Sequence, residues 1–126
     1  MAKLFSGCHS LEYLDISNFN TSKVNTMYHL FYECFSLKSI NLKNMDTSHV
    51  NNMTGIFQNC HSLKELDMST FNTSLISDMS YMFSGCYNLT TLNLNKFNTK
   101  NVIYMYNMFE NCYSLISLNL SNFKFK

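Results

Sequence analysis

Apolar and polar positions along the chain recur with one fixed period of 26 residues. This step separates the five cysteines, Cys8, Cys34, Cys60, Cys86 and Cys112. It also separates the members of a phenylalanine column and a leucine column, which are Phe5, Phe31, Phe57, Phe83 and Phe109, and Leu11, Leu37, Leu63, Leu89 and Leu115. No insertion interrupts the period. A repeat of about 20 to 50 residues predicts a solenoid, a propeller or an array.

Each repeat combines two hydrophobic patterns. In residues 34–59, Ile40 and Leu42 alternate with polar neighbours, and this period of two predicts a short strand with one solvated face. The second half places apolar side chains at Val50, Met53, Ile56, Phe57 and Cys60. These offsets form one stripe along a helix, so we expect a short helix after each strand.

Residues that favour helix ends flank this stripe. Thr47 and Ser48 precede it, and hydroxyl side chains are typical N-caps for free backbone N–H groups. The stripe ends in four repeats at a residue that tolerates left-handed backbone, Gly7, Asn59, Gly85 or Asn111, whereas Glu33 breaks this column. Capping also explains the threonine column more simply than an ice-binding array does, and its members are Thr21, Thr47, Thr73 and Thr99.

A single unit buries too little apolar surface to offset the ordering of its 26 residues, so the repeats must stack. A propeller would require about 40 residues and four strands per blade, which this period does not provide. We therefore expect a single domain, residues 1–126, with an α/β solenoid fold of about five 26-residue turns. A parallel sheet would line one side, and short helices the other.

The repeat unit resembles a known family. The residues that carry the resemblance are Met82-Phe83-Ser84-Gly85-Cys86, then Asn88-Leu89-x-x-Leu92-Asn93-Leu94 and Phe97-Asn98-Thr99. This run is similar to the BspA-like leucine-rich repeats of bacterial surface proteins and lipoproteins, including those of mycoplasmas, and the 26-residue subtype fits essentially the whole chain. The resemblance implies a leucine-rich-repeat solenoid, a cell-surface or extracellular location, and adhesion or protein–protein contact. It supplies no catalytic or ligand-binding residues.

Composition and charge narrow the function classes. The 126 residues carry nine Lys+Arg against eight Asp+Glu, a formal net charge of +1. This balance argues against nucleic-acid binding, which needs a dense basic patch. No apolar stretch approaches the ~18–20 residues of a membrane span. The N-terminal residues do not have the pattern of a signal peptide, and we expect neither a lipid-attachment cysteine nor an anchor in this chain.

The cysteine column is the first candidate for chemistry. Zinc needs four converging ligands, whereas this spacing offers a line, so we expect no metal and no cofactor. Equivalent positions in a stack point their Cβ atoms alike, and five is an odd number of cysteines. We therefore expect a ladder of buried thiols, with a disulfide as the alternative.

Two adjacent Cys–His pairs, Cys8-His9 and Cys60-His61, are candidates for a nucleophile and its base. No third orienting group recurs beside them, so we do not expect an enzyme. The histidine column continues as Phe35, Tyr87 and Tyr113, which is typical of a semi-exposed stacking ladder.

Two surfaces are candidates for recognition. A polar column follows the strands at Asp15, Asn41, Asp67, Asn93 and Asn119, which predicts a solvated sheet face with side-chain amide ladders, or alternatively a recognition face. That face lacks the recurring Tyr, Trp or Arg typical of binding hot spots. Outward aromatic residues vary between repeats, and we select them as the candidate binding surface: Tyr28, Tyr32, Phe35, Tyr81, Tyr87, Tyr106 and Tyr113.

The first repeat opens in mid-unit without an apolar cap, so Phe5, Leu11 and Leu14 are candidates for an end-to-end contact. We predict a non-enzymatic interaction or adhesion module whose partner is a host protein or a second copy of the chain. The alternative is a self-assembling structural subunit that stacks head to tail.

Overall fold

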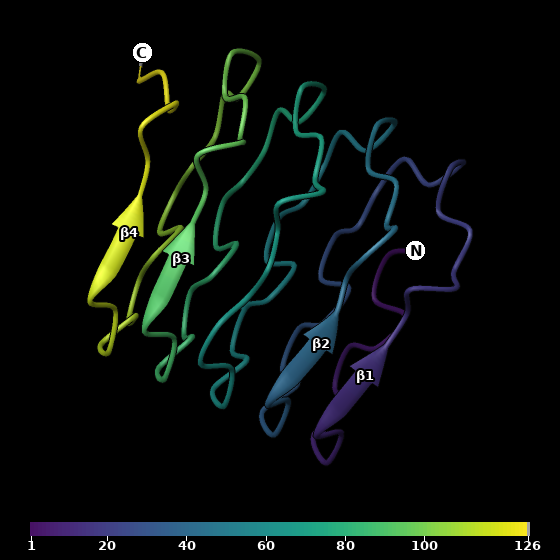
Figure 1. Ribbon diagram of the computed structural model, residues 1–126, viewed down its shortest axis with the longest axis vertical. Coiled ribbons are helices and arrows are strands. Elements are labelled where there is room, and N and C mark those ends of the chain that lie inside the picture. Colours follow the sequence, from purple (N-terminus) through teal and green to yellow (C-terminus); the bar gives the residue numbers. More distant parts are fainter. Residues whose placement is uncertain (126) are drawn as a thin grey trace.

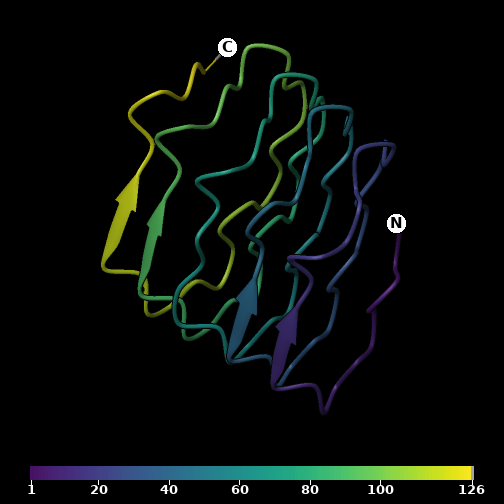
Figure 2. The same ribbon diagram turned by 45° about the vertical axis from the view of Figure 1, so that its right-hand side comes forward.

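The computed structural model describes residues 1–125, and the chain winds into successive turns that stack side by side (Figures 1 and 2). Four short strands lie on one side of the stack: β1 (Tyr13–Asp15), β2 (Ser39–Asn41), β3 (Thr91–Asn93) and β4 (Ser117–Asn119). They form two parallel pairs, in which Leu14 lies opposite Ile40 and Leu92 opposite Leu118. Like residues therefore stand above like, as the repeat predicts.

The sheet is divided between the two strand pairs. Residues 65–67 occupy the place between β2 and β3 and reach β3 through a single bridge, Glu65 to Thr91. Within residues 1–125, no backbone hydrogen bond joins residues 65–67 to β2. The four strands consequently form two separate two-stranded sheets rather than one continuous sheet.

The expected helices are absent from the described residues, so that part of the predicted α/β fold class is wrong. The second half of each repeat consists of turns whose N–H groups donate to the following turn of the solenoid. Phe31 N–H donates to Ile56 C=O at 3.0 Å, and Phe57 N–H donates to Met82 C=O at 3.1 Å. Because these donors are paired between turns, they are not available to a helix, which needs acceptors four residues back.

Left-handed residues also exclude a helix here. The column Gly7, Glu33, Asn59, Gly85 and Asn111 has positive φ throughout, which confirms its predicted backbone conformation and extends it to Glu33. A second column, four residues earlier, is also left-handed: Lys3, His29, Gly55, Tyr81 and Asn107. Two such residues per repeat break the backbone where the sequence pattern favoured a continuous helix.

Stacked aromatic rings fill the centre. The rings of the phenylalanine column are 5.2 to 6.1 Å apart between centroids, and Phe31, Phe57 and Phe83 are fully buried. Offset stacks of this kind contribute about 0.5–1.5 kcal/mol per pair beyond simple burial. The hydrophobic core is therefore continuous along the stack.

All five cysteines are free thiols, and those of the three middle members, Cys34, Cys60 and Cys86, are buried as predicted. Each thiol from Cys34 onward donates to the carbonyl of the phenylalanine 29 residues earlier, as Cys60 Sγ does to Phe31 O at 3.2 Å. Burial raises the pKa of the Cys34 thiol to about 11. The four thiols from Cys34 onward are thus protonated donors that brace one turn against another.

The threonine column braces the stack at another corner. Thr73 Oγ1 donates to Asn98 C=O at 3.1 Å and accepts from Asn98 N–H at 2.8 Å, and its equivalents repeat both bonds in the other turns. These threonines are 1–2 % exposed. The predicted N-cap role of Thr47 and Ser48 is therefore wrong, and the threonines are too buried to form an ice-binding surface.

Candidate functional site on the strand face

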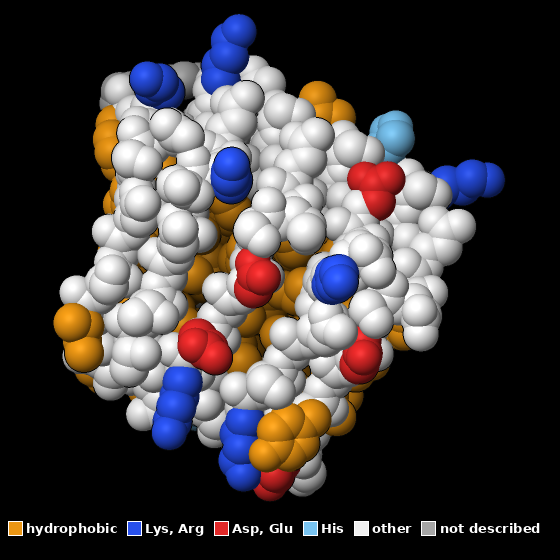
Figure 3. All heavy atoms as spheres, in the orientation of Figure 1, with side chains coloured by type: hydrophobic (Ala, Val, Ile, Leu, Met, Phe, Trp, Pro, Cys, Tyr) orange, Lys and Arg blue, Asp and Glu red, His pale blue; other side chains and the backbone are white. Residues whose placement is uncertain are grey.

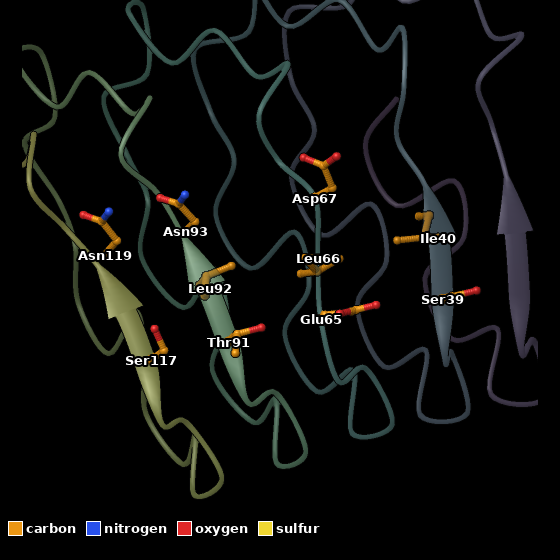
Figure 4. A pocket seen from close by; sticks show the side chains of 10 residues that line it. All are labelled: Ser39, Ile40, Glu65, Leu66, Asp67, Thr91, Leu92, Asn93, Ser117 and Asn119. Atoms are coloured by element: carbon orange, nitrogen blue, oxygen red, sulfur yellow. The ribbon is translucent and has the colours of Figure 1, made fainter.

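A hollow of about 540 Å³ lies on the strand face, and we call it the strand-face hollow. Ten residues line it: Ser39, Ile40, Glu65, Leu66, Asp67, Thr91, Leu92, Asn93, Ser117 and Asn119. Figure 4 shows these side chains in three rows across the turns. Hydroxyls and one carboxylate form the first row, aliphatic side chains the second, and amides with the other carboxylate the third.

The division of the sheet creates this hollow. Since β2 and residues 65–67 are not hydrogen-bonded, the aliphatic side chains of Ile40 and Leu66 are not closed over and remain half-exposed. Figure 3 shows hydrophobic side chains at the bottom of the depression, flanked by acidic groups. The site therefore offers an apolar floor with a polar rim.

Local hydrogen bonds hold the polar row that follows the strands. Asp67 Oδ1 accepts from Ser69 N–H at 3.0 Å, Asn93 Oδ1 accepts from Asn95 N–H at 3.1 Å, and the other turns repeat the contact. These are Asx turns. The predicted solvated polar column is confirmed, but its bonds lie within each turn rather than forming amide ladders between turns.

Two acidic residues, Glu65 and Asp67, line the strand-face hollow, and no basic residue lines it. Hydrogen bonds from Ser69 lower the pKa of Asp67, so this carboxylate is ionised at neutral pH. Among the described residues, the ion pairs are His9–Glu33 at 3.7 Å and Lys38–Glu12 at 3.0 Å. Neither Glu65 nor Asp67 belongs to a pair, so both remain available to a cationic group of a ligand.

The predicted aromatic surface falls into two separate parts. Phe35, Tyr87 and Tyr113 join His9 and His61 in one stack along an edge, with centroids 4.3 to 5.6 Å apart. This confirms the predicted stacking ladder, which we call the edge ladder. Phe35, His61 and Tyr87 each lie between two rings and therefore present mainly their edges to a partner, whereas Tyr113 at the end of the ladder is 76 % exposed.

The remaining members lie in the second half of the repeat. Tyr28 and Tyr32 stack on either side of His29, at 4.0 and 4.4 Å between centroids. Tyr81 is half-buried, whereas Tyr106 is 62 % exposed. We call these four residues the tyrosine surface: Tyr28, Tyr32, Tyr81 and Tyr106. Its binding role stays a prediction, because the structure does not bring the seven residues into one patch.

In both Cys–His pairs the cysteine packs against the core and the histidine ring belongs to the edge ladder. Cys60 Sγ donates to Phe31 C=O, while the His61 ring lies between Phe35 and Tyr87 at 4.7 and 4.3 Å. Burial raises the pKa of Cys60 and lowers that of His61. A protonated thiol and a stacked imidazole that point apart do not form a nucleophile and base.

The predicted end-to-end residues belong to the first turn. Phe5, Leu11 and Leu14 are half-buried and pack against the core, and the Phe5 ring stacks on Phe31 at 5.8 Å.

The strand-face hollow was not predicted from the sequence, because it depends on unpaired backbone between β2 and residues 65–67 and not on a motif.

Almost the whole chain matches one protein family. A family model described as "Mycoplasma protein of unknown function, DUF285" matches residues 1–41 and 36–126. The chain belongs to this family. No curated protein matches this DUF285 chain.

Among solved structures, the DUF285 chain is similar to the leucine-rich repeat protein of T. pallidum, with a TM-score of 0.60 and 22 % sequence identity. The match covers 98 % of the DUF285 chain and 62 % of the T. pallidum chain. At this identity the similarity shows the fold alone, and that fold is a leucine-rich-repeat solenoid. None of the described residues forms a helix long and apolar enough to cross a membrane.

Proposed function

We propose that this DUF285 chain is a non-enzymatic module that binds another protein through its strand face. The observation that carries the proposal is the strand-face hollow, with its apolar floor, unpaired Glu65 and Asp67, and exposed Thr91 and Ser117 hydroxyls. Such a combination of apolar floor and polar rim is typical of protein-binding sites. The resemblance to BspA-like repeats of the 26-residue subtype, with about five turns, further favours adhesion and a surface or extracellular location.

Most other recurring polar groups are bonded within the solenoid, which supports the strand face as the binding surface. Thiols, threonine hydroxyls and Asx side chains are bonded to backbone groups, so they stabilise the frame. The side chains of Ser39, Glu65, Thr91 and Ser117 instead lie in an outward row in Figure 4. A rigid frame lowers the entropy cost of binding, because the partner meets side chains whose backbone is already fixed.

The charge and apolar floor of the strand-face hollow indicate which kind of side chain would bind there. Two carboxylates over an apolar floor fit a Lys or Arg side chain, whose aliphatic stem packs on Ile40, Leu66 and Leu92 while its charge meets Glu65 and Asp67. Serine and threonine hydroxyls can donate to carbonyl oxygens of the same partner segment. We therefore propose a basic, extended polypeptide segment as the occupant.

A selection from a random peptide library tests the proposal. Peptides selected on the wild-type chain should contain Lys or Arg, and Thr91→Arg, which fills the hollow with a positive charge, should abolish their binding. Tyr106→Arg is the matched control, since it places the same charge on the exposed tyrosine surface. Loss of binding with Tyr106→Arg but not Thr91→Arg would assign recognition to the tyrosine surface, and failure to select any sequence family would refute the interaction role.

A second candidate function is head-to-tail self-assembly, and an apolar end surface favours it. A hollow of about 240 Å³ in the last turn is lined by Met105, Met108, Phe109, Leu120, Phe123 and Phe125. Phe125 is 74 % exposed, and Leu4 in the first turn is 56 % exposed. The candidate predicts that the mass of the isolated chain rises with protein concentration.

A further inference from the structure

Three lysines gather around another hollow, which we call the lysine corner. The hollow measures about 360 Å³ and is lined by Lys96, Phe97, Asn98, Lys100, Asn122 and Lys124. All three lysine side chains are exposed. Figure 3 shows several basic side chains gathered at the upper left, over the C-terminal turns, without an acidic group among them.

The frame does not require lysine at these positions. Equivalent residues are Asn18, Asn44, Thr70 and Asn122 for Lys96, and Ser22, Ser48, Ser74 and Lys126 for Lys100. Those for Lys124 are Asn20, Asp46, Asn72 and Asn98. Short polar residues therefore suffice to build a turn here, so the three positive charges are not needed to form it.

The lysine corner is not neutralised within the molecule. Residues 79–126 contain four Lys and one acidic residue, Glu110, whereas residues 1–78 contain five Lys and seven acidic residues. None of the lysines of the corner takes part in an ion pair among the described residues. The two ends of the solenoid consequently differ in charge.

The backbone under the lysines is fixed. Thr99 Oγ1 accepts from Lys124 N–H at 2.7 Å, and Asn98 Oδ1 accepts from Lys100 N–H at 3.0 Å. Asn98 N–H is itself bonded to Thr73 Oγ1 at 2.8 Å. Only the lysine side chains need to be ordered when an anion binds, which keeps the entropy cost low.

We propose that the lysine corner binds carboxylate side chains of an acidic segment in a protein partner. Lysine is a compact point charge that suits carboxylates on flexible side chains. The corner follows the ends of β3 and β4, and Asn93 and Asn119 at those ends line the strand-face hollow. One partner polypeptide that fills the strand-face hollow with a basic group therefore meets the lysine corner with the residues beyond it.

A protein fits this surface better than an anionic membrane does. Acidic and basic side chains lie on the same face in Figure 3. Glu65 and Asp67 line the strand-face hollow, as Figure 4 shows. A negatively charged bilayer that approached this face would be repelled by those carboxylates, whereas a polypeptide can match both signs locally. The inference rests on the proposed interaction function, because it describes the same kind of partner.

The test uses hexaglutamate as the probe and hexaglutamine as the neutral control, followed by ¹⁵N–¹H NMR on the full chain. Hexaglutamate should shift the amide signals of residues 96–100 and 122–124, and added salt should weaken the shifts. The triple variant K96Q/K100Q/K124Q should weaken binding about tenfold, which corresponds to about 1.4 kcal/mol shared among three exposed charge pairs.

The matched control is K23Q/K43Q/K64Q, which removes the same charge from lysines outside the corner. Binding should be nearly unchanged in this variant. Equal weakening in both triple variants, or no shift at the corner, would overturn the proposal. Vesicles of phosphatidylcholine and phosphatidylserine in equal parts form a third arm, and binding to them that the corner variant abolishes would assign the corner to membranes instead.

Failure of this inference is distinguishable from failure of the proposed function. Library peptides that bind the wild-type chain and lose binding in Thr91→Arg would keep the strand-face function, even if hexaglutamate did not bind the lysine corner. Conversely, hexaglutamate should still bind Thr91→Arg, because that residue does not line the corner.

Discussion

At the residue scale, the repeated side chains contact their equivalents in the neighbouring turns. Phe57 is fully buried, and its ring lies between Phe31 and Phe83 at 5.2 and 6.1 Å. An aromatic ring at this place both fills the core and stacks on its equivalents. The phenylalanine column is therefore a continuous support for the whole length of the solenoid.

Phe57→Ala should lower the free energy of unfolding by about 3–5 kcal/mol, because it removes a buried ring and leaves a cavity in the middle of the stack. Urea denaturation followed by circular dichroism measures the loss. Asn95→Ala serves as the control and should change stability by less than ~0.5 kcal/mol, as surface substitutions usually do. A loss below ~1 kcal/mol for Phe57→Ala would contradict the packing described here.

The glycines of the left-handed column allow a paired experiment. Gly7 and Gly85 have the same φ of +75°, so alanine at either position costs about 1–2 kcal/mol in backbone strain. A Cβ at Gly85 would also collide with the side chain of Asn59, whereas at Gly7 the nearest atom is His9 Nε2 at 3.9 Å. Gly85→Ala should therefore be the more destabilising change.

Asn59→Gly isolates the collision, since it removes the obstructing side chain without adding strain. In the Asn59→Gly variant, thermal unfolding should show that Gly85→Ala and Gly7→Ala lower the free energy of unfolding by about the same amount. A persistent difference would mean that the extra cost does not arise from the Asn59 side chain but from other contacts, such as the Cα of residue 59 at 3.3 Å.

At the element scale, the sequence predicted one half of the repeat and misassigned the other. The strands, the buried thiols and the stacked columns follow from the period, because equivalent residues must occupy equivalent places in a stack. The helix was wrong because turns that bond to the following turn, such as Phe31 N–H to Ile56 C=O, produce the same apolar spacing of three to four residues as a helix.

Backbone features without a shared residue type could not be predicted. The second left-handed column contains Lys3, His29, Gly55, Tyr81 and Asn107, which have no chemistry in common. The strand-face hollow is similar, since Glu65 differs from Ser39 and Thr91 in its column but nothing in the period indicates that residues 65–67 leave β2 unpaired. Both features depend on how whole turns fit together.

The threonine brace is an element-scale contact that can be removed cleanly. Thr73→Val keeps the shape of the side chain but leaves the backbone N–H and C=O of Asn98 without their partner. Burying unsatisfied groups costs about 1–3 kcal/mol, and urea denaturation should show a loss in that range. Thr70→Val, on an exposed neighbour, should be nearly neutral, and equal effects of the two variants would contradict the bracing role.

The edge ladder makes stability depend on pH. Burial lowers the pKa of His61 below its ordinary value of 6.5, so the unfolded chain binds a proton more readily than the folded chain. The stabilisation is complete above about pH 6.5 and is lost as the pH falls through the folded pKa. His29 acts in the same direction, since burial and the charge of Lys3 lower its pKa.

His61→Phe, which copies Phe35 in the same column, should make the stability curve flatter between pH 7 and pH 5. Melting temperatures recorded across this range measure the effect. If the melting temperature of His61→Phe changed with pH as that of the wild type does, the His61 imidazole would not contribute to the pH dependence of stability.

At the scale of the whole molecule, each turn contacts only its neighbours, so the two end turns decide whether copies associate. In every turn before the last, the phenylalanine N–H donates to a carbonyl of the following turn, as Phe83 does to Met108 at 3.0 Å. Phe109 holds the donor position in the last turn, and Leu4 holds the equivalent acceptor position in the first. Two copies of the isolated chain can therefore continue the same hydrogen-bond register.

Head-to-tail stacking of the isolated 126-residue chain should appear as a molar mass that rises with concentration in sedimentation or light-scattering experiments. Leu4→Lys should suppress the rise, because it puts an unpaired charge into the apolar contact between end turns. Leu75→Lys is the matched control, since Leu75 is 51 % exposed against 56 % for Leu4 but lies on the side of a middle turn. A strict monomer at millimolar concentration, or equal suppression by both lysines, would exclude an end-to-end contact and leave the strand face as the interaction surface of the solenoid.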